Sequence, residues 1–131
     1  MNFILSYIAT LIPLAILDSI WLLGIGKGFY AKHMSFLFGK INLIPAVVFY
    51  PVYALGILLL AIWPAVTASS WTEALWRGAL LGLVSYGAYD LTNQATIPNW
   101  PTIMTLVDMA WGMVVTALTS VIAYFIITNF W

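Results

Sequence analysis

The chain has 131 residues, of which 64% are hydrophobic and only 6% are charged, with four basic and four acidic side chains. A soluble domain carries roughly 25% charged residues, so this composition excludes a water-soluble globule, and its high hydrophobicity excludes intrinsic disorder. The balanced charge gives no field that would attract nucleic acid, and the lack of cysteine excludes disulfides, thiolate metal sites and cysteine nucleophiles.

Four apolar stretches are long enough to form membrane helices, which need about 20 mostly apolar residues. We expect them at about residues 3–25, 41–66, 71–97 and 102–130, which leaves a single domain over residues 1–131. Backbone polar groups in lipid must be bonded within the chain, and this favours helices. The predicted fold class is therefore all-α, an integral membrane bundle of four transmembrane helices.

Local signals predict where these helices begin and end. The glycines of GIGKG (residues 24–28) predict the end of the first helix, and Pro64 with the following TASS predicts the end of the second. Ser70 followed by Glu73 fits a capping box that starts the third helix. Pro101 is well placed in the first turn of the fourth helix.

The connection at residues 26–40, GKGFYAKHMSFLFGK, holds every lysine of the chain: Lys27, Lys32 and Lys40. Aromatic residues alternate with these charges, so we expect a short interfacial segment between the first two helices. Short basic loops stay in the cytoplasm. This predicts that loop 26–40 and turn 98–101 are cytoplasmic and that both termini lie outside.

Three of the four acidic residues lie well inside the apolar stretches, away from the first turn of a helix: Asp18, Asp90 and Asp108. In an up-and-down bundle each lies roughly 10 Å below the same membrane surface, and Asn42 starts the second helix on that side. Ionisable residues within membrane spans are usually functional. We therefore expect an inward-facing polar pocket, with Lys27 and Lys40 as counter-charges at its mouth. The alternative is a purely structural role, in which the acids only form hydrogen bonds between neighbouring helices.

The third and fourth helices each carry small or polar residues at every fourth position, a pattern typical of close helix packing. On the third helix these are Gly78, Gly82, Tyr86, Asp90 and then Asn93 or Gln94, and on the fourth Asp108, Gly112, Thr116 and Ser120.

Aromatic residues near the acids predict the walls of the pocket. Trp21 and Trp111 each follow an aspartate by three residues. The candidate pocket residues are Asp18, Trp21, Asn42, Tyr86, Asp90, Asn93, Asp108 and Trp111, with Tyr50 and Tyr53 as further walls. The sequence contains no established metal motif and indicates no particular cofactor; if a metal bound, Asp18, Asp90 and Asp108 would be its ligands.

Several segments resemble a family of small bacterial predicted membrane proteins, domain of unknown function 2177. They are LDSIWL, the FY of GFYAKH, FYPVY, YDLTNQAT and TLVDMAWG, and they extend over almost the whole chain. The resemblance implies a single four-helix domain in the bacterial inner membrane, without an established activity. The residues that match its motifs are Asp18, Trp21, Tyr89, Asp90, Thr92, Asn93, Asp108, Trp111 and Gly112. Asn99 stands before Trp100 where the resemblance leads us to expect an acid.

Three functions are compatible with these features. The first is binding or transport of a small amphipathic or cationic ligand, because three acids without a buried base favour a cation; a chain this small would then act as a homodimer or in a larger complex. The second is a membrane enzyme acting on a lipid or isoprenoid by acid–base or metal-assisted chemistry. The third is an accessory subunit without a ligand, whose partners are the lipid bilayer and larger membrane proteins.

Overall fold

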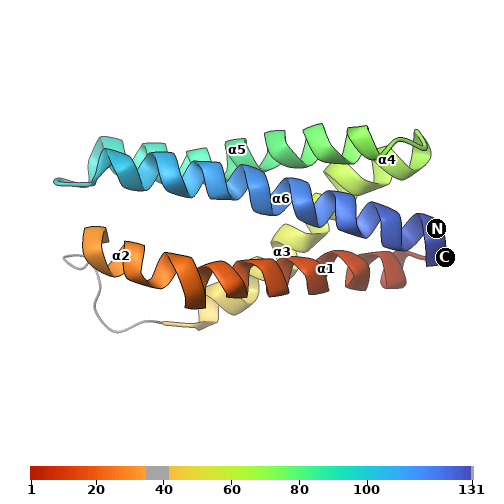
Figure 1. Ribbon diagram of the computed structural model, residues 1–131, viewed down its shortest axis with the longest axis horizontal. Helices are drawn as coiled ribbons and strands as arrows, with labels where there is room; N and C mark the ends of the chain where they lie inside the picture. The colour runs from red at the N-terminus through yellow and green to blue at the C-terminus, as the bar shows by residue number, and fades with distance from the viewer. Residues whose placement is uncertain (35–41, 131) are drawn as a thin grey trace.

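The computed structural model describes residues 1–34 and 42–130, and over these residues the chain consists of helices and short turns (Figure 1). Within the described residues, two of the helices contain a π-helical turn. The elements in chain order are α1 (Phe3–Ile20), η1 (Trp21–Ile25), α2 (Gly26–Met34), α3 (Ile44–Ile57), η3 (Leu58–Ile62), α4 (Trp63–Thr67), α5 (Trp71–Thr96) and α6 (Thr102–Phe130). Continuous helix therefore extends over Phe3–Met34 and over Ile44–Thr67.

The first helix does not end at the glycines of residues 24–28. It continues through η1 into the nine residues of α2, because glycine permits a helix end without imposing one, and continued helix keeps the backbone groups bonded. The backbone N–H of Gly26 bonds to the carbonyl of Trp21. The first part of the predicted interfacial segment is thus helical, and its remainder, including Lys40, lies outside the described residues.

Three helices in the described part of the chain are long and apolar enough to cross a membrane: Phe3–Met34, Ile44–Thr67 and Thr102–Phe130. The fourth expected span, α5, has 26 residues, or about 39 Å of helix, but it also carries Glu73, Arg77 and Asp90. The all-helical membrane architecture is therefore confirmed in its coarse form, and a membrane crossing by α5 stays a prediction.

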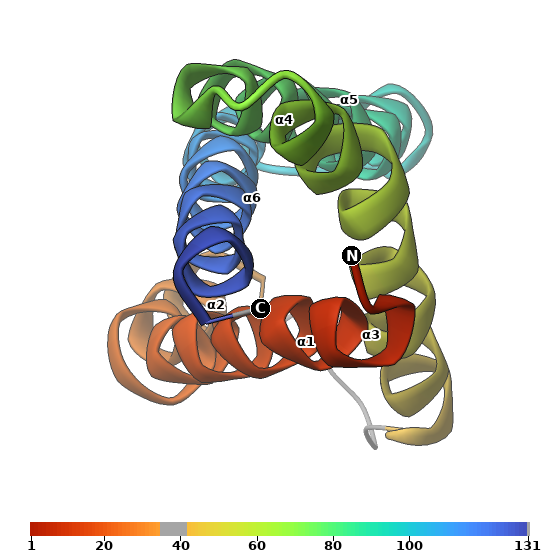
Figure 2. The same cartoon turned by 90° about the vertical axis from the view of Figure 1, so that its right-hand side faces the viewer.

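Viewed along their length, the helices surround a common axis (Figure 2). The long helix α6 packs against both α1 and α5, while the α3–α4 helix packs against α1 through α3 and against α5 through η3 and α4. Apolar side chains fill the space between them, among them the fully buried Leu14, Ile57, Ile62 and Val115. The N-terminus and the end of α6 lie at one end of the bundle, and α2 and the 97–101 turn lie at the other (Figure 1).

The closest packing joins α5 and α6, along the two stripes of small residues that the sequence predicts. The facing pairs are Gly78 with Ser120, Gly82 with Thr116, and Tyr86 with Gly112. A Cβ atom on Gly82 would also overlap the backbone carbonyl of Gly112. The two antiparallel helices therefore pass each other in a fixed register, stepping by four residues in opposite directions.

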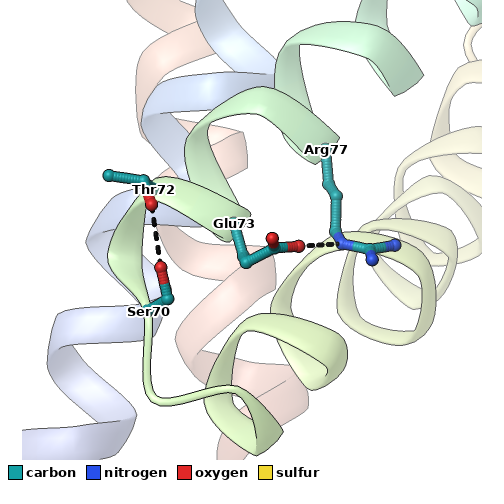
Figure 3. Close-up of polar contacts among 4 residues, drawn as sticks. All are labelled: Ser70, Thr72, Glu73 and Arg77. Atoms are coloured by element: carbon teal, nitrogen blue, oxygen red, sulfur yellow. Dashed lines mark hydrogen bonds and ion pairs between the residues drawn. The ribbon is translucent and has the colours of Figure 1, made fainter.

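The start of α5 corrects the predicted capping box. Ser70 is the N-cap residue, but its side chain makes no capping hydrogen bond; its Oγ lies 2.8 Å from Oγ1 of Thr72 instead. Glu73 accepts a hydrogen bond from Nε of Arg77 at 2.7 Å (Figure 3). The Glu73 carboxylate, which a capping box would need, is instead paired with Arg77 one turn further along the helix.

Candidate functional site

A cavity of about 310 Å³ lies between α1, η1, α2, α3, α5 and α6, toward the end of the bundle that carries α2. Seven of its lining side chains are aromatic and two are carboxylates. The lining residues are Asp18, Trp21, Leu22, Tyr30, Phe49, Tyr50, Ser85, Tyr86, Tyr89, Asp108 and Trp111. Five of the eight sequence-predicted site residues thus line one cavity.

Asp18 connects three helices through its carboxylate. Its Oδ2 accepts a hydrogen bond from the hydroxyl of Tyr50 on α3, and its Oδ1 accepts one from Nε1–H of Trp111 on α6 at 2.9 Å. Only 6% of Asp18 is exposed. Because both oxygens have donors, the carboxylate is held in one orientation beside the cavity.

Asp108 is held by the other end of the first helix. Its Oδ1 accepts a 2.6 Å hydrogen bond from the hydroxyl of Tyr30 on α2, and this hydroxyl accepts a bond from Nε1–H of Trp21 at 2.9 Å. The chain Trp21–Tyr30–Asp108 therefore links η1 and α2 to α6.

The two tryptophans that follow the aspartates stack on each other. The rings of Trp21 and Trp111 are nearly parallel, at 9°, with centroids 4.7 Å apart. The indole N–H of Trp111 donates to Asp18 itself, and that of Trp21 donates to the Tyr30 hydroxyl that is bonded to Asp108. The repeated D-x-x-W spacing thus places one aromatic pair between Asp18 and Asp108.

The π-helical turn brings Asp18 and Tyr30 to the same side of their helix. Twelve residues of regular α-helix would leave the two side chains about 120° apart. One extra residue in the η1 turn takes up about 100° of rotation, so that only about 20° separates them. Without η1, Tyr30 would point away from Asp108.

Gly26 makes this turn compatible with the position of Trp21. A Cβ atom at residue 26 would lie 2.8 Å from the carbonyl oxygen of Trp21 and 2.9 Å from its Nε1. Both distances are shorter than van der Waals contact. The glycine that the sequence suggests as a helix end instead makes room for the indole.

Asp90 lies next to the cavity rather than in its wall. Its side chain is fully buried on α5, and the register of α5 against α6 places Asp108 opposite it. Among the described residues, neither Asp90 oxygen has a hydrogen-bond donor.

Asn42 and Asn93 do not line the cavity. Asn42 is exposed, and its Oδ1 accepts a bond from the backbone N–H of Ile44 at the start of α3. The backbone carbonyl of Asn93 accepts the N–H of Ile97 where α5 ends. Tyr53, expected as a wall, is buried in the core with its hydroxyl 2.7 Å from Oγ1 of Thr116.

No basic side chain pairs with these acids in the described residues. The single ion pair there joins Glu73 to Arg77, near the opposite end of α5, and Lys27 is exposed. The described residues also contain no group of three His, Cys, Asp or Glu side chains that could hold a metal ion. Of the three acids named from the sequence as conditional metal ligands, Asp18 and Asp108 line the cavity and Asp90 does not.

A second cavity of about 300 Å³ adjoins the first and shares Leu22, Tyr30, Tyr89 and Asp108 with it. Its other lining residues are Met34, Trp100 and Met104. The Tyr30–Asp108 hydrogen bond belongs to the walls of both cavities. We call the first the inner cavity and the second, which is lined by Trp100, the outer vestibule.

Sequence reasoning did not select Tyr30, Phe49 or Ser85 as site residues. Tyr30 lies in the segment that the sequence predicts to be interfacial, and Ser85 has no distinguishing spacing. A signal for Tyr30 and Phe49 is nevertheless present in the sequence, because they belong to the FY of GFYAKH and to FYPVY, two of the segments that resemble the family.

The fold and cavity define a class: helical membrane proteins with an aromatic, carboxylate-bearing cavity inside the bundle. The model of the family described as predicted membrane protein, domain of unknown function 2177, matches residues 3–125. The chain belongs to this family. No curated protein and no solved structure matches it.

Proposed function

We propose that the protein binds a small amphipathic cation in the inner cavity, within the membrane. The observation that carries this proposal is the pair of acids in one aromatic cavity, Asp18 and Asp108, without a basic partner among the described residues. A carboxylate removed from water is unstable unless an opposite charge or sufficient hydrogen bonds compensate for its lost hydration. A bound cation would supply that charge.

The aromatic walls favour a cation with apolar substituents. The stacked pair Trp21–Trp111 offers a ring face, and Tyr50, Tyr86 and Phe49 surround the remaining space. Cations are attracted to the negative faces of aromatic rings, most strongly to tryptophan, and more so when they are poorly hydrated. A substituted ammonium group fits this lining better than a strongly hydrated inorganic ion.

We further propose that the chain lies in the bacterial inner membrane, with α5 as the fourth crossing. The basic residues of α2 favour a cytoplasmic position for the end of the bundle that carries the vestibule. Both termini would then lie outside. Transport of the cation, and a homodimer that performs it, are extensions of this proposal.

Titration with benzyltrimethylammonium tests the binding step. This cation has a permanent charge and an aromatic group, and its binding to the protein in lipid nanodiscs is measured by calorimetry. We expect Asp18→Asn to lower the affinity at least about tenfold, because it removes one charge from a poorly solvated site. Glu73→Gln is the matched control, since it makes the same chemical change outside the cavity.

A neutral analogue separates charge recognition from apolar partitioning. Neopentylbenzene has the same shape as the cation, with carbon in place of the charged nitrogen, and should not displace it from the site. Equal competition by the two compounds, or an unchanged affinity in Asp18→Asn, would overturn the proposal. Absence of binding to the unmodified protein would do so as well.

A further inference from the structure

The register of α5 and α6 places two acids directly opposite each other. The facing pairs along the seam end with Tyr86 against Gly112, and the next step of four residues on each helix brings Asp90 to Asp108. Asp90 is fully buried at this point of the seam, and Asp108 is also buried. The stripe of close-packed glycines thus leads into a pair of carboxyl groups beside the inner cavity.

Among the residues that the structure describes, no group stabilises a charge on Asp90. The side chain is fully buried, and neither oxygen has a donor among the described residues. Tyr89 is its neighbour on α5, Asp108 faces it from α6, and Tyr30 on α2 reaches the pair only through Asp108. None of these groups carries a positive charge.

Two carboxylates cannot hydrogen-bond to each other, because both are acceptors. With one proton between them, the same two groups form a strong, charge-assisted hydrogen bond. The proton would satisfy the orphaned Asp90 oxygens, while the Tyr30 hydroxyl continues to bond to Oδ1 of Asp108.

We propose that Asp90 and Asp108 share one proton, and that a cation entering the inner cavity beside Asp108 expels this proton to water. The proposal rests on the cation binding proposed above, and it couples that binding to the release of a proton. The cation replaces the positive charge of the proton, so the net charge of the site stays constant. The proton leaves from Asp108, which also lines the outer vestibule. The protein would then exchange a proton for a cation.

Coupled binding has a defined pH dependence. Because protons and the cation compete for the pair, the affinity for benzyltrimethylammonium falls as the pH is lowered. Release of one proton per cation predicts a change of about tenfold per pH unit while the pair is protonated. Benzyltrimethylammonium has no acidic N–H, so any proton that appears comes from the protein.

Calorimetric titrations of the nanodisc-embedded protein in two buffers of different ionisation enthalpy count the protons released. We expect about one per cation bound for the unmodified protein. In Asp90→Asn, the amide can donate to Asp108, which then stays ionised, and both the proton release and the pH dependence should disappear. Glu73→Gln should keep both, because it lies at the other end of α5.

The results separate this inference from the proposed function. Binding that releases no proton and does not change with pH would overturn the coupling and leave cation binding intact. A failure to bind at any pH would remove both. Full proton release in folded Asp90→Asn would overturn the role of Asp90. If that variant does not fold, the number of protons that the unmodified protein releases per cation tests the coupling by itself.

Discussion

At the residue scale, Gly82 shows how little space separates α5 from α6. A methyl group there would overlap the carbonyl of Gly112, which is part of a helix backbone and cannot rotate away. We expect Gly82→Ala to lower the free energy of unfolding by roughly 1–3 kcal/mol, the usual effect of overfilling a packed interface. Thermal unfolding in a mild detergent, followed by circular dichroism, measures this change.

Gly56 on α3 supplies the control, because a Cβ atom at that position would meet nothing within 4 Å. The same change to alanine should therefore be neutral, or stabilising by up to about 1 kcal/mol through its helix propensity. Equal unfolding temperatures for the two variants would show that the α5–α6 contact is looser than described.

At the element scale, the η1 turn decides whether α2 contributes to the cavity. We expect Gly26→Ala to displace the Trp21 ring or remove the π turn, because its Cβ would lie 2.8 Å from the Trp21 carbonyl oxygen. Either change separates Tyr30 from Asp108. Binding of benzyltrimethylammonium should weaken at least about tenfold, with a shift in tryptophan emission as the Trp21–Trp111 stack is disturbed.

Gly28 lies only two residues further along, and a Cβ atom there would meet nothing within 4 Å. Gly28→Ala should therefore bind the cation as the unmodified protein does. A comparable loss in both variants would mean that general helix stiffening, rather than contact with Trp21, is responsible.

These elements also show the limits of prediction from sequence. The four apolar stretches and the glycine stripes follow from composition and a four-residue spacing, and so does the burial of Asp18, Asp90 and Asp108. A π turn has no such spacing signal. It depends on which side chains meet after the helices have packed, and the glycines around it equally suit a helix end.

The same limitation explains the site residues that were missed or misplaced. The sequence predicts Tyr30 to lie in a connecting segment, because the rotation introduced by η1, on which its place in the cavity depends, has no sequence signal. The depth of Asn42 alone makes it a candidate in the sequence, but its Oδ1 accepts the backbone N–H of Ile44 at the start of α3. Depth along a helix can be read from residue number, whereas the direction of a side chain near an irregular turn depends on the tertiary structure.

At the scale of the whole molecule, the central question is whether α5 crosses the membrane, and the two ends of this helix allow a direct test. Thr72 and Thr96 lie in its first and last turns, and both are exposed. The chain contains no cysteine, so Thr72→Cys and Thr96→Cys each introduce a single thiol. We expect an impermeant maleimide added to intact cells to label residue 72 and to leave residue 96 unlabelled.

The expectation follows from length and charge together. The 26 residues of α5 span about 39 Å, more than the roughly 30 Å of the hydrocarbon layer, and the basic residues of α2 favour the cytoplasm for the end that carries Thr96. Membrane permeabilisation should make both thiols reactive, which shows that neither is buried. Labelling of both in intact cells would place α5 on the outer surface and leave Asp90 without the shielding of a bundle within lipid. Labelling of residue 96 alone would keep the crossing and reverse the orientation, so that the vestibule would open to the outside.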